Sequence, residues 1–211
     1  MIRIDIVSDV ICPWCFIGKR RLERALAAEP PGTVEIGWRP FQLNPDMPPE
    51  GMARKDYLRA KFGTDDPGRF GQVVAAGLEE GIPFAFERMQ RTPNTVRAHR
   101  LIRFADRAGK VDALVETLFR AYFLEARDVG DIDVLADVAA AAGLERDTVA
   151  AYLASDEDDK LVREEDAYAR QLGINGVPCF VVDRKYAISG AQPPETFTEV
   201  FRRVRESAAA E

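Results

Sequence analysis

The sequence predicts an α/β fold in which a long helical block interrupts one unit of mixed strands and helices. Residues 2–8 and 33–39 are short and rich in β-branched side chains, and a helical pattern that starts at Pro13 lies between them. Strand-like segments return near 179–189, after an almost wholly helical stretch over 53–172. Because both halves are needed to complete one sheet, the helical block lies inside a single domain.

The N-terminal half is predicted to run strand, helix, strand. Residues 2–8 end at Asp9, and the pattern that follows places these apolar side chains on one helical face: Trp14, Ile17, Leu22, Ala25 and Leu26. Pro13 suits the first position of this helix, where a missing N–H leaves no hydrogen bond unmade. The Pro-Pro-Gly run at 30–32 ends the helix before the second strand.

The middle of the chain is predicted to form helices separated by turns. The expected helical ranges are about 53–62, 67–80, 94–108, 111–125, 131–142, 146–154 and 157–172. Glycine and proline residues mark the turns between them. Asn94 or Thr95 is the expected N-cap of the third helix, since both follow Pro93 and carry a side-chain oxygen.

The C-terminal half is predicted to contain a hairpin and a last helix. The two strands of the hairpin are 179–183 and 185–189, and the helix runs from Pro194 to about Glu206. The expected domains are a discontinuous domain made of residues 1–52 and 158–211, and a helical insertion over residues 53–157.

Length and charge narrow the classes of function. The 211 residues suit one domain, and 46% apolar residues suffice for a full core. The 35 Asp and Glu residues outnumber the 29 Lys and Arg residues, which gives a net charge of −6. This acidic balance lacks the basic footprint of general nucleic-acid binding and argues against docking on an anionic membrane. We therefore expect neither nucleic acid nor a membrane as a partner. The sequence is compatible with a monomer or a homodimer.

The compartment is predicted from targeting signals. The first residues show no charged region followed by a long apolar run, and no stretch of about 18 consecutive apolar residues occurs. We therefore expect a cytoplasmic protein without a membrane span. Structural disulfides are rare in that compartment, so a close cysteine pair there indicates metal binding or redox chemistry.

Three cysteines and one histidine are the scarce reactive groups of this chain. Cys12 and Cys15 are three residues apart at a strand-to-helix junction, so both sulfurs lie on one side of the first helical turn. The helix N-terminus stabilises an anion at Cys12, and a thiolate is the nucleophilic form of cysteine. We therefore predict that Cys12 attacks a disulfide and that Cys15 resolves the mixed disulfide.

Zinc binding is the main alternative for a Cys-x-x-Cys pair. Structural zinc takes four ligands, and only Cys179 and His99 remain to complete such a set. Neither has the paired spacing of zinc ligands, and Pro13 at the junction fits a redox pair better. We therefore predict no metal. A pair of inert buried cysteines is a further alternative, which the Cys-Pro-Trp-Cys run at this junction disfavours.

Several motifs carry a family resemblance over nearly the whole chain, from residue 4 to about 197. The first is Cys12-Pro13-Trp14-Cys15 after a strand, and the second is Gly176-Val177-Pro178 before a strand. Further stretches are Ser8 to Lys19, Trp38 to Pro45, Tyr57-Leu58, Lys61 to Gly63, Asn94-Thr95, and Ala98 to Arg100. They resemble the DsbA family of the thioredoxin superfamily, in its FrnE-like branch. The resemblance implies a thioredoxin fold with a large all-helical insertion between a β-α-β half and an α-β-β-α half.

The resemblance also implies roles for the residues around the pair. Pro178 would be a cis-proline facing the cysteines, and the backbone of Val177 would pair with an extended substrate. Pro13 and Trp14 would contact substrate and tune the thiolate of Cys12. Neither of them is histidine, so one source of thiolate stabilisation known from DsbA proteins is absent, and we expect an intermediate redox potential.

Four further residues have two interpretations each. Asn94 and His99 would be substrate-binding residues of the cleft, or an N-cap and a hydrogen-bonded interhelical histidine. Cys179 would be an accessory redox thiol beside the pair, or a small buried hydrophobic residue, which we favour. Asp9 would relay a proton to Cys15, or cap the turn into the helix.

The predicted function is that of a thiol–disulfide oxidoreductase, acting as a disulfide reductase, isomerase or oxidase. Its substrates would be disulfide-containing proteins or small thiols; no cofactor is required, and glutathione is a candidate redox partner. One alternative is a glutathione-dependent transferase or isomerase of the kappa or 2-hydroxychromene-2-carboxylate isomerase type, which needs no resolving Cys15. A second alternative is a redox-sensing or chaperone-like protein that binds clients without using either cysteine of the pair.

Overall fold

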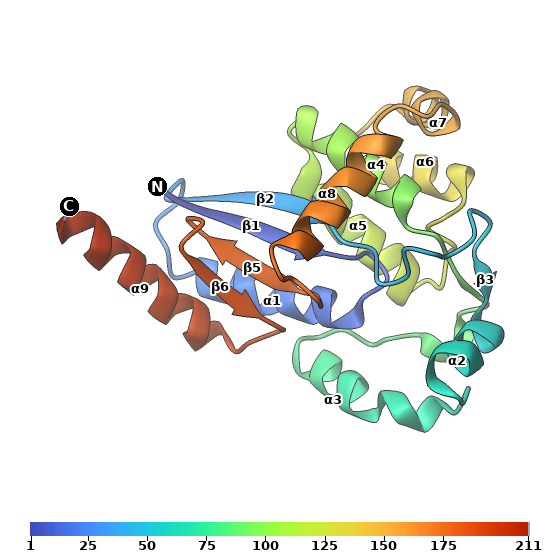
Figure 1. Ribbon diagram of the computed structural model, residues 1–211, viewed down its shortest axis with the longest axis horizontal. Helices are drawn as coiled ribbons and strands as arrows, with labels where there is room; N and C mark the ends of the chain where they lie inside the picture. The colour runs from blue at the N-terminus through green and yellow to red at the C-terminus, as the bar shows by residue number, and fades with distance from the viewer. Residues whose placement is uncertain (211) are drawn as a thin grey trace.

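A four-stranded mixed sheet forms the centre of the fold in the order β2-β1-β5-β6 (Figure 1). The computed structural model describes residues 1–210, with the side chains of all but residues 67, 69, 209 and 210. The strands are β1 (Ile2–Ser8), β2 (Val34–Pro40), β5 (Cys179–Val182) and β6 (Tyr186–Ser189). β1 pairs in parallel with β2 and antiparallel with β5, and β5 pairs antiparallel with β6. The predicted α/β fold with a helical insertion is confirmed.

Helices cover both faces of this sheet (Figure 1). They are α1 (Pro13–Leu26) and α9 (Pro194–Ala210) on one face and α8 (Asp159–Gln171) on the other. Successive residues of β5 point to opposite faces. Phe180 therefore meets Phe197 of α9, with ring centroids 4.8 Å apart, whereas Cys179 packs with Ala169 of α8. α9 extends beyond the end predicted near Glu206.

The helical insertion contains more short elements than the sequence predicts. Its helices are α2 (Arg54–Phe62), α3 (Gly71–Glu79), α4 (Val96–Arg107), α5 (Val111–Phe123), α6 (Ile132–Ala141) and α7 (Arg146–Ala154). The helix predicted over 67–80 begins as a 3-10 turn at Pro67–Phe70. A second 3-10 turn (Phe86–Arg88) and the pair β3 (Met52–Ala53) and β4 (Arg91–Thr92) were not predicted, because elements of two or three residues have no periodicity.

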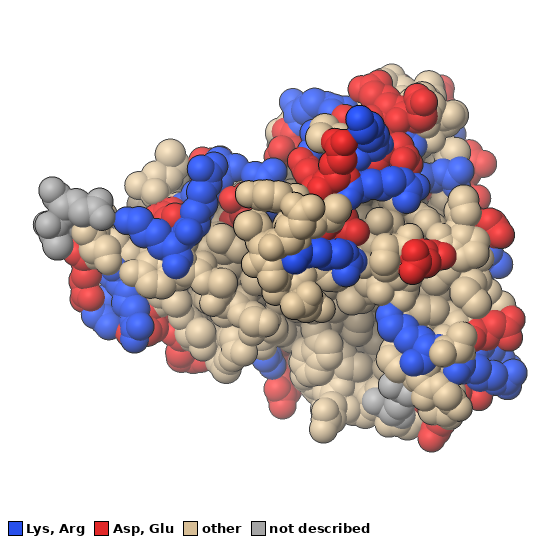
Figure 2. Space-filling model, in the orientation of Figure 1, with Lys and Arg blue, Asp and Glu red and all other residues tan. Residues whose placement is uncertain are grey.

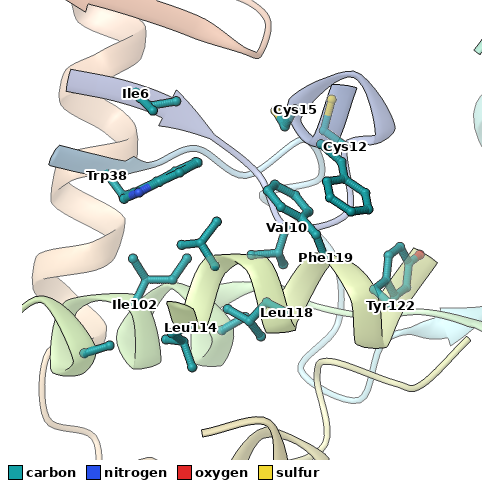
Figure 3. Close-up of a cluster of buried hydrophobic side chains, with 14 of the residues drawn as sticks. Ile6, Val10, Cys12, Cys15, Trp38, Ile102, Leu114, Leu118, Phe119 and Tyr122 are labelled. Carbon is teal, nitrogen blue, oxygen red and sulfur yellow. The ribbon is translucent and has the colours of Figure 1, made fainter. Parts of the chain in front are cut away.

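Aromatic side chains join the sheet domain to the helical insertion (Figure 3). Phe16 of α1 stacks on Phe119 of α5 with ring centroids 5.1 Å apart, and Trp38 of β2 meets the same ring edge-on at 6.5 Å. The indole N–H of Trp38 also donates to Asp112 at 3.1 Å. One continuous hydrophobic core thus includes side chains from both predicted parts. The division into a discontinuous domain (1–52 and 158–211) and a helical insertion (53–157) stays a prediction.

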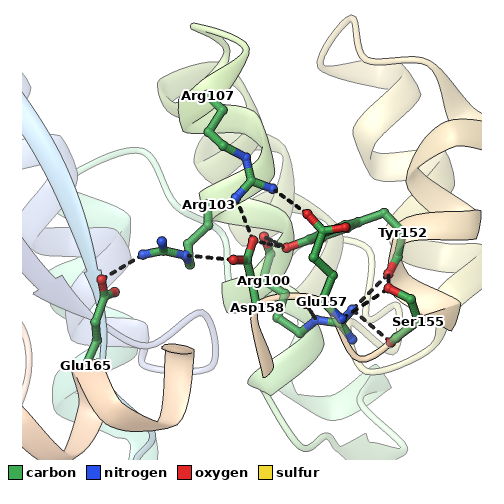
Figure 4. Close-up of polar contacts among 8 residues, drawn as sticks. All are labelled: Arg100, Arg103, Arg107, Tyr152, Ser155, Glu157, Asp158 and Glu165. Carbon is green, nitrogen blue, oxygen red and sulfur yellow. Dashed lines mark hydrogen bonds and ion pairs between the residues drawn. The ribbon is translucent and has the colours of Figure 1, made fainter. Parts of the chain in front are cut away.

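A buried arginine ties α4 to the segment between α7 and α8 (Figure 4). Arg100 is 3% exposed, and its guanidinium donates to four main-chain oxygens, those of Tyr152, Leu153, Ser155 and Glu157. Asp158 accepts hydrogen bonds from Tyr152 and Arg107 beside it. The carbonyls at the end of α7 are satisfied in this way, and α4 is held against the end of α7 and the segment that follows it.

Charged side chains of both signs are mixed over α4, α7 and α8 (Figure 2). Among the described residues, no helix has the length and apolar character that a membrane span requires.

Gly77 in α3 allows the aromatic segment after that helix to pack closely. A Cβ atom at this position would lie 2.3 Å from Cε2 of Phe84. That ring cannot move away freely, because it stacks on Phe86 at 4.8 Å and meets Phe123 edge-on at 5.3 Å. Around Gly71 of the same helix, no described atom beyond its chain neighbours and its own helix backbone lies within 4 Å of the Cβ position.

We predict that Gly77→Ala lowers the free energy of unfolding by about 1–3 kcal/mol, as overpacked core positions do. The matched variant Gly71→Ala should be neutral or stabilising by up to about 1 kcal/mol, because alanine favours helix more than glycine does. Urea unfolding of both variants measures the difference. Equal stabilities of the two variants would contradict the close packing of Gly77 against Phe84.

Candidate active site

The cysteine pair lies where β1 turns into α1. Cys12 is the N-cap residue of α1, and its N–H donates to the carbonyl of Asp9 at 3.0 Å. Pro13 occupies the first helical position, as predicted from its missing N–H. No side chain caps this helix and its first turn contains no acidic residue. The free N–H groups and the positive end of the helix dipole therefore face the sulfur of Cys12, with no acidic side chain of the first turn between them.

The loop before β5 contacts this sulfur from the opposite side. The peptide bond between Val177 and Pro178 is cis, and Sγ of Cys12 lies 3.5 Å from the carbonyl oxygen of Val177. Pro178 packs on α1 at Gly18, where a Cβ atom would come within 3.0 Å of its ring. The carbonyl of Pro178 accepts from Gly190 at 2.8 Å. The loop is thus held between α1 and the end of β6.

Cys15 lies one turn further along α1, and its environment differs from that of Cys12. Both are free thiols, and they lie on the turn above α5 (Figure 3). Burial raises the pKa of the Cys15 thiol well above its ordinary value, and the hydrogen bond and charge of Cys12 raise it further. The Ser8 hydroxyl and the backbone N–H of Asp9 act in the opposite direction. Cys15 therefore keeps its proton in the dithiol state at neutral pH.

Asp9 is fully buried beneath the pair. Its Oδ2 accepts a hydrogen bond from the N–H of Leu43 at 2.7 Å, so its carboxylate holds the segment after β2. Its Oδ1 lies 3.5 Å from Nε2 of His99, and neither of these two atoms has a hydrogen-bond partner among the residues that the structure describes. A second buried carboxylate, that of Asp166, accepts from the N–H of Gln42 at 2.9 Å. Two carboxylates thus fix the backbone next to the site.

Two predicted substrate-binding residues, Asn94 and His99, do not line the cavity that contains the sulfur of Cys12. His99 is 3% exposed and faces Asp9 behind the pair. Asn94 lies at the start of α4, where Oδ1 accepts from the N–H of Val96 at 3.0 Å and Nδ2 donates to the Met47 carbonyl at 2.7 Å. Asn94 thus holds a loop, and neither it nor His99 lines the cavity beside Cys12. Their predicted substrate-binding roles gain no support from this geometry.

Cys179 lies on the face of the sheet that α8 covers, rather than beside the pair. It packs with Val7, Phe41 and Ala169, and burial raises the pKa of its thiol. These contacts agree with the interpretation of Cys179 as a small buried hydrophobic residue. The accessory redox role of Cys179 stays a prediction.

A cavity of about 390 Å³ opens beside Cys12. Three predicted residues, Pro13, Trp14 and Val177, line it together with Cys12, and Trp14 is 37% exposed. Its other wall comes from the helical insertion: Arg54, Tyr57, Leu58, Lys61 and Phe62 of α2, then Phe70, Gln72, Val73, Phe86 and Phe123. In Figure 2, Lys and Arg side chains lie over α2 at this side of the molecule.

The α2 wall of the cavity was not predicted from the sequence. Arg54, Tyr57, Leu58 and Lys61 share one helical face through their spacing, which gives the only available signal. The same spacing occurs on any helix that packs on a core. Only the tertiary arrangement shows that this face turns toward Cys12. Within residues 1–210, no three His, Cys, Asp or Glu side chains are grouped so that they could hold a metal ion.

A family model described as a DSBA-like thioredoxin domain matches residues 3–202. The chain belongs to this family. A crystal structure of a probable DsbA oxidoreductase from Streptomyces coelicolor is 35% identical, with a TM-score of 0.87, over 96% of this chain and 89% of the other. The uncharacterized protein YwbO of Bacillus subtilis is 27% identical over 201 residues, which are 95% of this chain and 96% of YwbO.

A more distant match extends the fold comparison. The cytosolic disulfide reductase DsbM from Pseudomonas aeruginosa, in a structure with GSH, is 16% identical with a TM-score of 0.71. The alignment covers 96% of this chain and 99% of DsbM. At this identity the match shows a shared fold.

We predict that limiting iodoacetamide alkylates Cys12 in the reduced native protein about tenfold or more faster than Cys15 or Cys179. All three thiols are buried, but Cys12 alone of them lines the cavity, and burial raises the pKa of the other two. Peptide mass spectrometry after short labelling times measures the three rates, and the denatured protein, in which all three should react alike, is the control. Faster labelling of Cys15 or Cys179 in the native state would contradict the assigned environments.

The stability of the reduced protein should fall as the pH rises above about 8.5, where an unfolded thiol begins to lose its proton. The raised pKa of Cys15 means that the folded state keeps a proton that the unfolded state has released. The free energy of unfolding therefore decreases with pH in this window. Urea unfolding between about pH 7 and pH 10 tests this. The free energy of unfolding should decline less with pH in Cys15→Ser than in the wild type. An equal decline in both proteins would mean that groups other than Cys15 cause it.

Proposed function

We propose that this member of the DsbA-like family is a thiol–disulfide oxidoreductase that works through Cys12 and Cys15. The observation that carries the proposal is the inequality of the two thiols. Cys12 lies at an uncapped helix N-terminus and lines a cavity, whereas burial raises the pKa of Cys15 one turn away. Disulfide exchange requires such a difference in environment, because one cysteine attacks as a thiolate while the other stays protonated until it resolves the mixed disulfide.

In the first step, the thiolate of Cys12 attacks one sulfur of a substrate disulfide. A mixed disulfide forms, and the other substrate sulfur leaves as a thiolate. The exposed Trp14 and the free side of the loop at Val177 offer a surface on which an extended substrate would lie. The positive end of α1 stabilises the Cys12 thiolate that makes this attack.

In the second step, Cys15 passes its proton to the substrate thiolate released in the first step and attacks the sulfur of Cys12. The Cys12–Cys15 disulfide forms and the second substrate thiol is released, so two electrons pass from the dithiol to the substrate. The Ser8 hydroxyl and the backbone N–H of Asp9 favour the Cys15 thiolate that this step needs. Formation of the mixed disulfide removes the neighbouring Cys12 charge, which is one cause of the raised pKa of Cys15.

We further propose a FrnE-like cytoplasmic enzyme of intermediate redox potential, with glutathione as a candidate electron donor. The absence of histidine between the cysteines supports the intermediate potential. The structural similarity to DsbM, a cytosolic disulfide reductase solved with GSH, is compatible with the donor and with the compartment. In a reducing compartment the dithiol form would dominate, which favours reduction or isomerisation of substrates over oxidation.

A glutathione-dependent transferase or isomerase is the second candidate. The cavity beside Cys12 has a volume typical of small-molecule sites, which favours this alternative over a purely protein-binding function. Such an enzyme uses one nucleophilic position and has no need of Cys15. The presence of the second thiol one turn into α1 therefore supports disulfide exchange.

Replacement of Cys15 by serine distinguishes the two functions. For an oxidoreductase, Cys15→Ser should lose turnover in insulin reduction and accumulate a mixed disulfide at Cys12, visible by mass spectrometry. Cys179→Ser is the matched control and should keep turnover. Full insulin reduction by Cys15→Ser would contradict the proposed function. Glutathione transfer that survives in Cys15→Ser, with no insulin reduction by the wild type, would favour the transferase.

A further inference from the structure

The cavity beside Cys12 carries a net positive charge in an acidic protein. Two cations, Arg54 and Lys61, line it, and its described lining residues include no Asp or Glu. The chain as a whole has a net charge of −6. The positive charge is therefore a local property of the cavity wall that α2 provides.

Arg54 has no carboxylate partner among the described residues. Its Nη1 atom donates to the hydroxyls of Thr92 at 3.3 Å and Tyr122 at 3.5 Å, both of which are weak neutral contacts. Its guanidinium lies 5.7 Å from the ring centroid of Phe70. By contrast, Arg59 on the same helix pairs with Asp65 at 2.8 Å. Arg54 thus keeps donors for an anionic group that enters the cavity.

Lys61 is also without a carboxylate partner in the described part of the chain. Its ammonium donates to Oδ1 of Asn44 at 2.6 Å and to the carbonyl of Leu43 at 3.3 Å. It lies 5.4 Å from the ring centroid of Tyr57 and 5.9 Å from that of Phe62. These neutral oxygens and ring faces hold the cation in place without neutralising its charge.

The rest of the cavity wall suits an apolar or aromatic body. Five of the residues that line it are aromatic in addition to Trp14: Tyr57, Phe62, Phe70, Phe86 and Phe123. Small-molecule sites commonly combine such apolar walls with a few polar groups that orient the ligand. The volume of about 390 Å³ is in the range of those sites.

We propose that this cavity selects small aromatic or aliphatic disulfides that carry a carboxylate. Arg54 and Lys61 would bind the carboxylate, the aromatic wall would pack on the apolar body, and the disulfide would meet the sulfur of Cys12. This inference rests on the proposed oxidoreductase function and names its substrate class. The two cations would also stabilise the negative charge of the leaving thiolate. They would therefore increase the rate of exchange as well as the affinity for the substrate.

The reaction with such a substrate is balanced without any further reagent. The Cys12 thiolate forms a bond to one substrate sulfur, the substrate S–S bond breaks, and one anionic thiolate leaves. Cys15 then gives up its proton, which the thiolate released in the first step takes up, and bonds to Cys12 while the second thiolate leaves. The dithiol is oxidised by two electrons and the substrate disulfide is reduced by two.

Stopped-flow kinetics with two aromatic disulfides test the proposal. The reduced protein reacts with dithiobis(nitrobenzoate), which carries two carboxylates, or with neutral dithiodipyridine, and the second-order rate constants give an anionic-to-neutral ratio. Intrinsic reactivities cancel when this ratio is compared between proteins. We expect the ratio to fall about fivefold in Arg54→Gln and in Lys61→Gln, and to fall in the wild type as salt is added.

Two matched variants show whether the effect belongs to the cavity. Lys55 and Arg59 lie on the same helix, are exposed and do not line the cavity. Lys55→Gln and Arg59→Gln remove the same charge, and both should keep the wild-type ratio. Lys61→Glu should lower the ratio further than Lys61→Gln. Lys61 is exposed, so its variants should fold, which circular dichroism checks.

The outcomes separate this inference from the proposed function. A ratio that is unchanged in Arg54→Gln and Lys61→Gln, or that falls equally in Lys55→Gln, would overturn the anionic substrate class while leaving disulfide exchange intact. A wild type that releases no thiolate from either disulfide through Cys12 would instead refute the oxidoreductase function.

Discussion

The arrangement of the site depends on one buried residue, Asp9, at the end of β1. A fully buried carboxylate is costly unless it is hydrogen-bonded, and Asp9 accepts from the N–H of Leu43. Its main-chain carbonyl accepts a hydrogen bond from the N–H of Cys12. Its own N–H is hydrogen-bonded to the sulfur of Cys15 and lowers the pKa of that thiol. Asp9 therefore positions both cysteines and Leu43, which also lines the cavity, and its carboxylate faces His99 of the helical insertion.

The site combines two parts with different tasks. The sheet domain supplies the sulfur chemistry, because the turn after β1, the helix dipole of α1 and the loop at Val177 converge on Cys12. The helical insertion supplies the opposite wall of the cavity and its charge through Arg54 and Lys61. The stacking of Phe16 on Phe119 and the hydrogen bond from Arg103 of α4 to Glu165 of α8 hold the two parts together.

The fold and the reactive pair could be predicted because their signals are local: a strand, then Cys12 and Pro13 at a helix start, and a Val-Pro loop before a later strand. The short elements around residues 86–92 and the cation-lined wall could not, because they depend on contacts between distant segments. Asn94 illustrates this difference between local and tertiary signals. Its side chain has the expected cap-like bond to Val96, yet it holds the Met47 loop instead of lining the cavity.

Equilibration in glutathione redox buffers, followed by trapping of thiols and mass spectrometry, tests the central claim most directly. The account predicts that two electrons are lost in one transition, with a disulfide between Cys12 and Cys15 and with Cys179 still a thiol. The transition should lie between the potentials of thioredoxin, about −270 mV, and DsbA, about −120 mV. The absence of a Cys12–Cys15 disulfide in oxidising buffer would contradict the account.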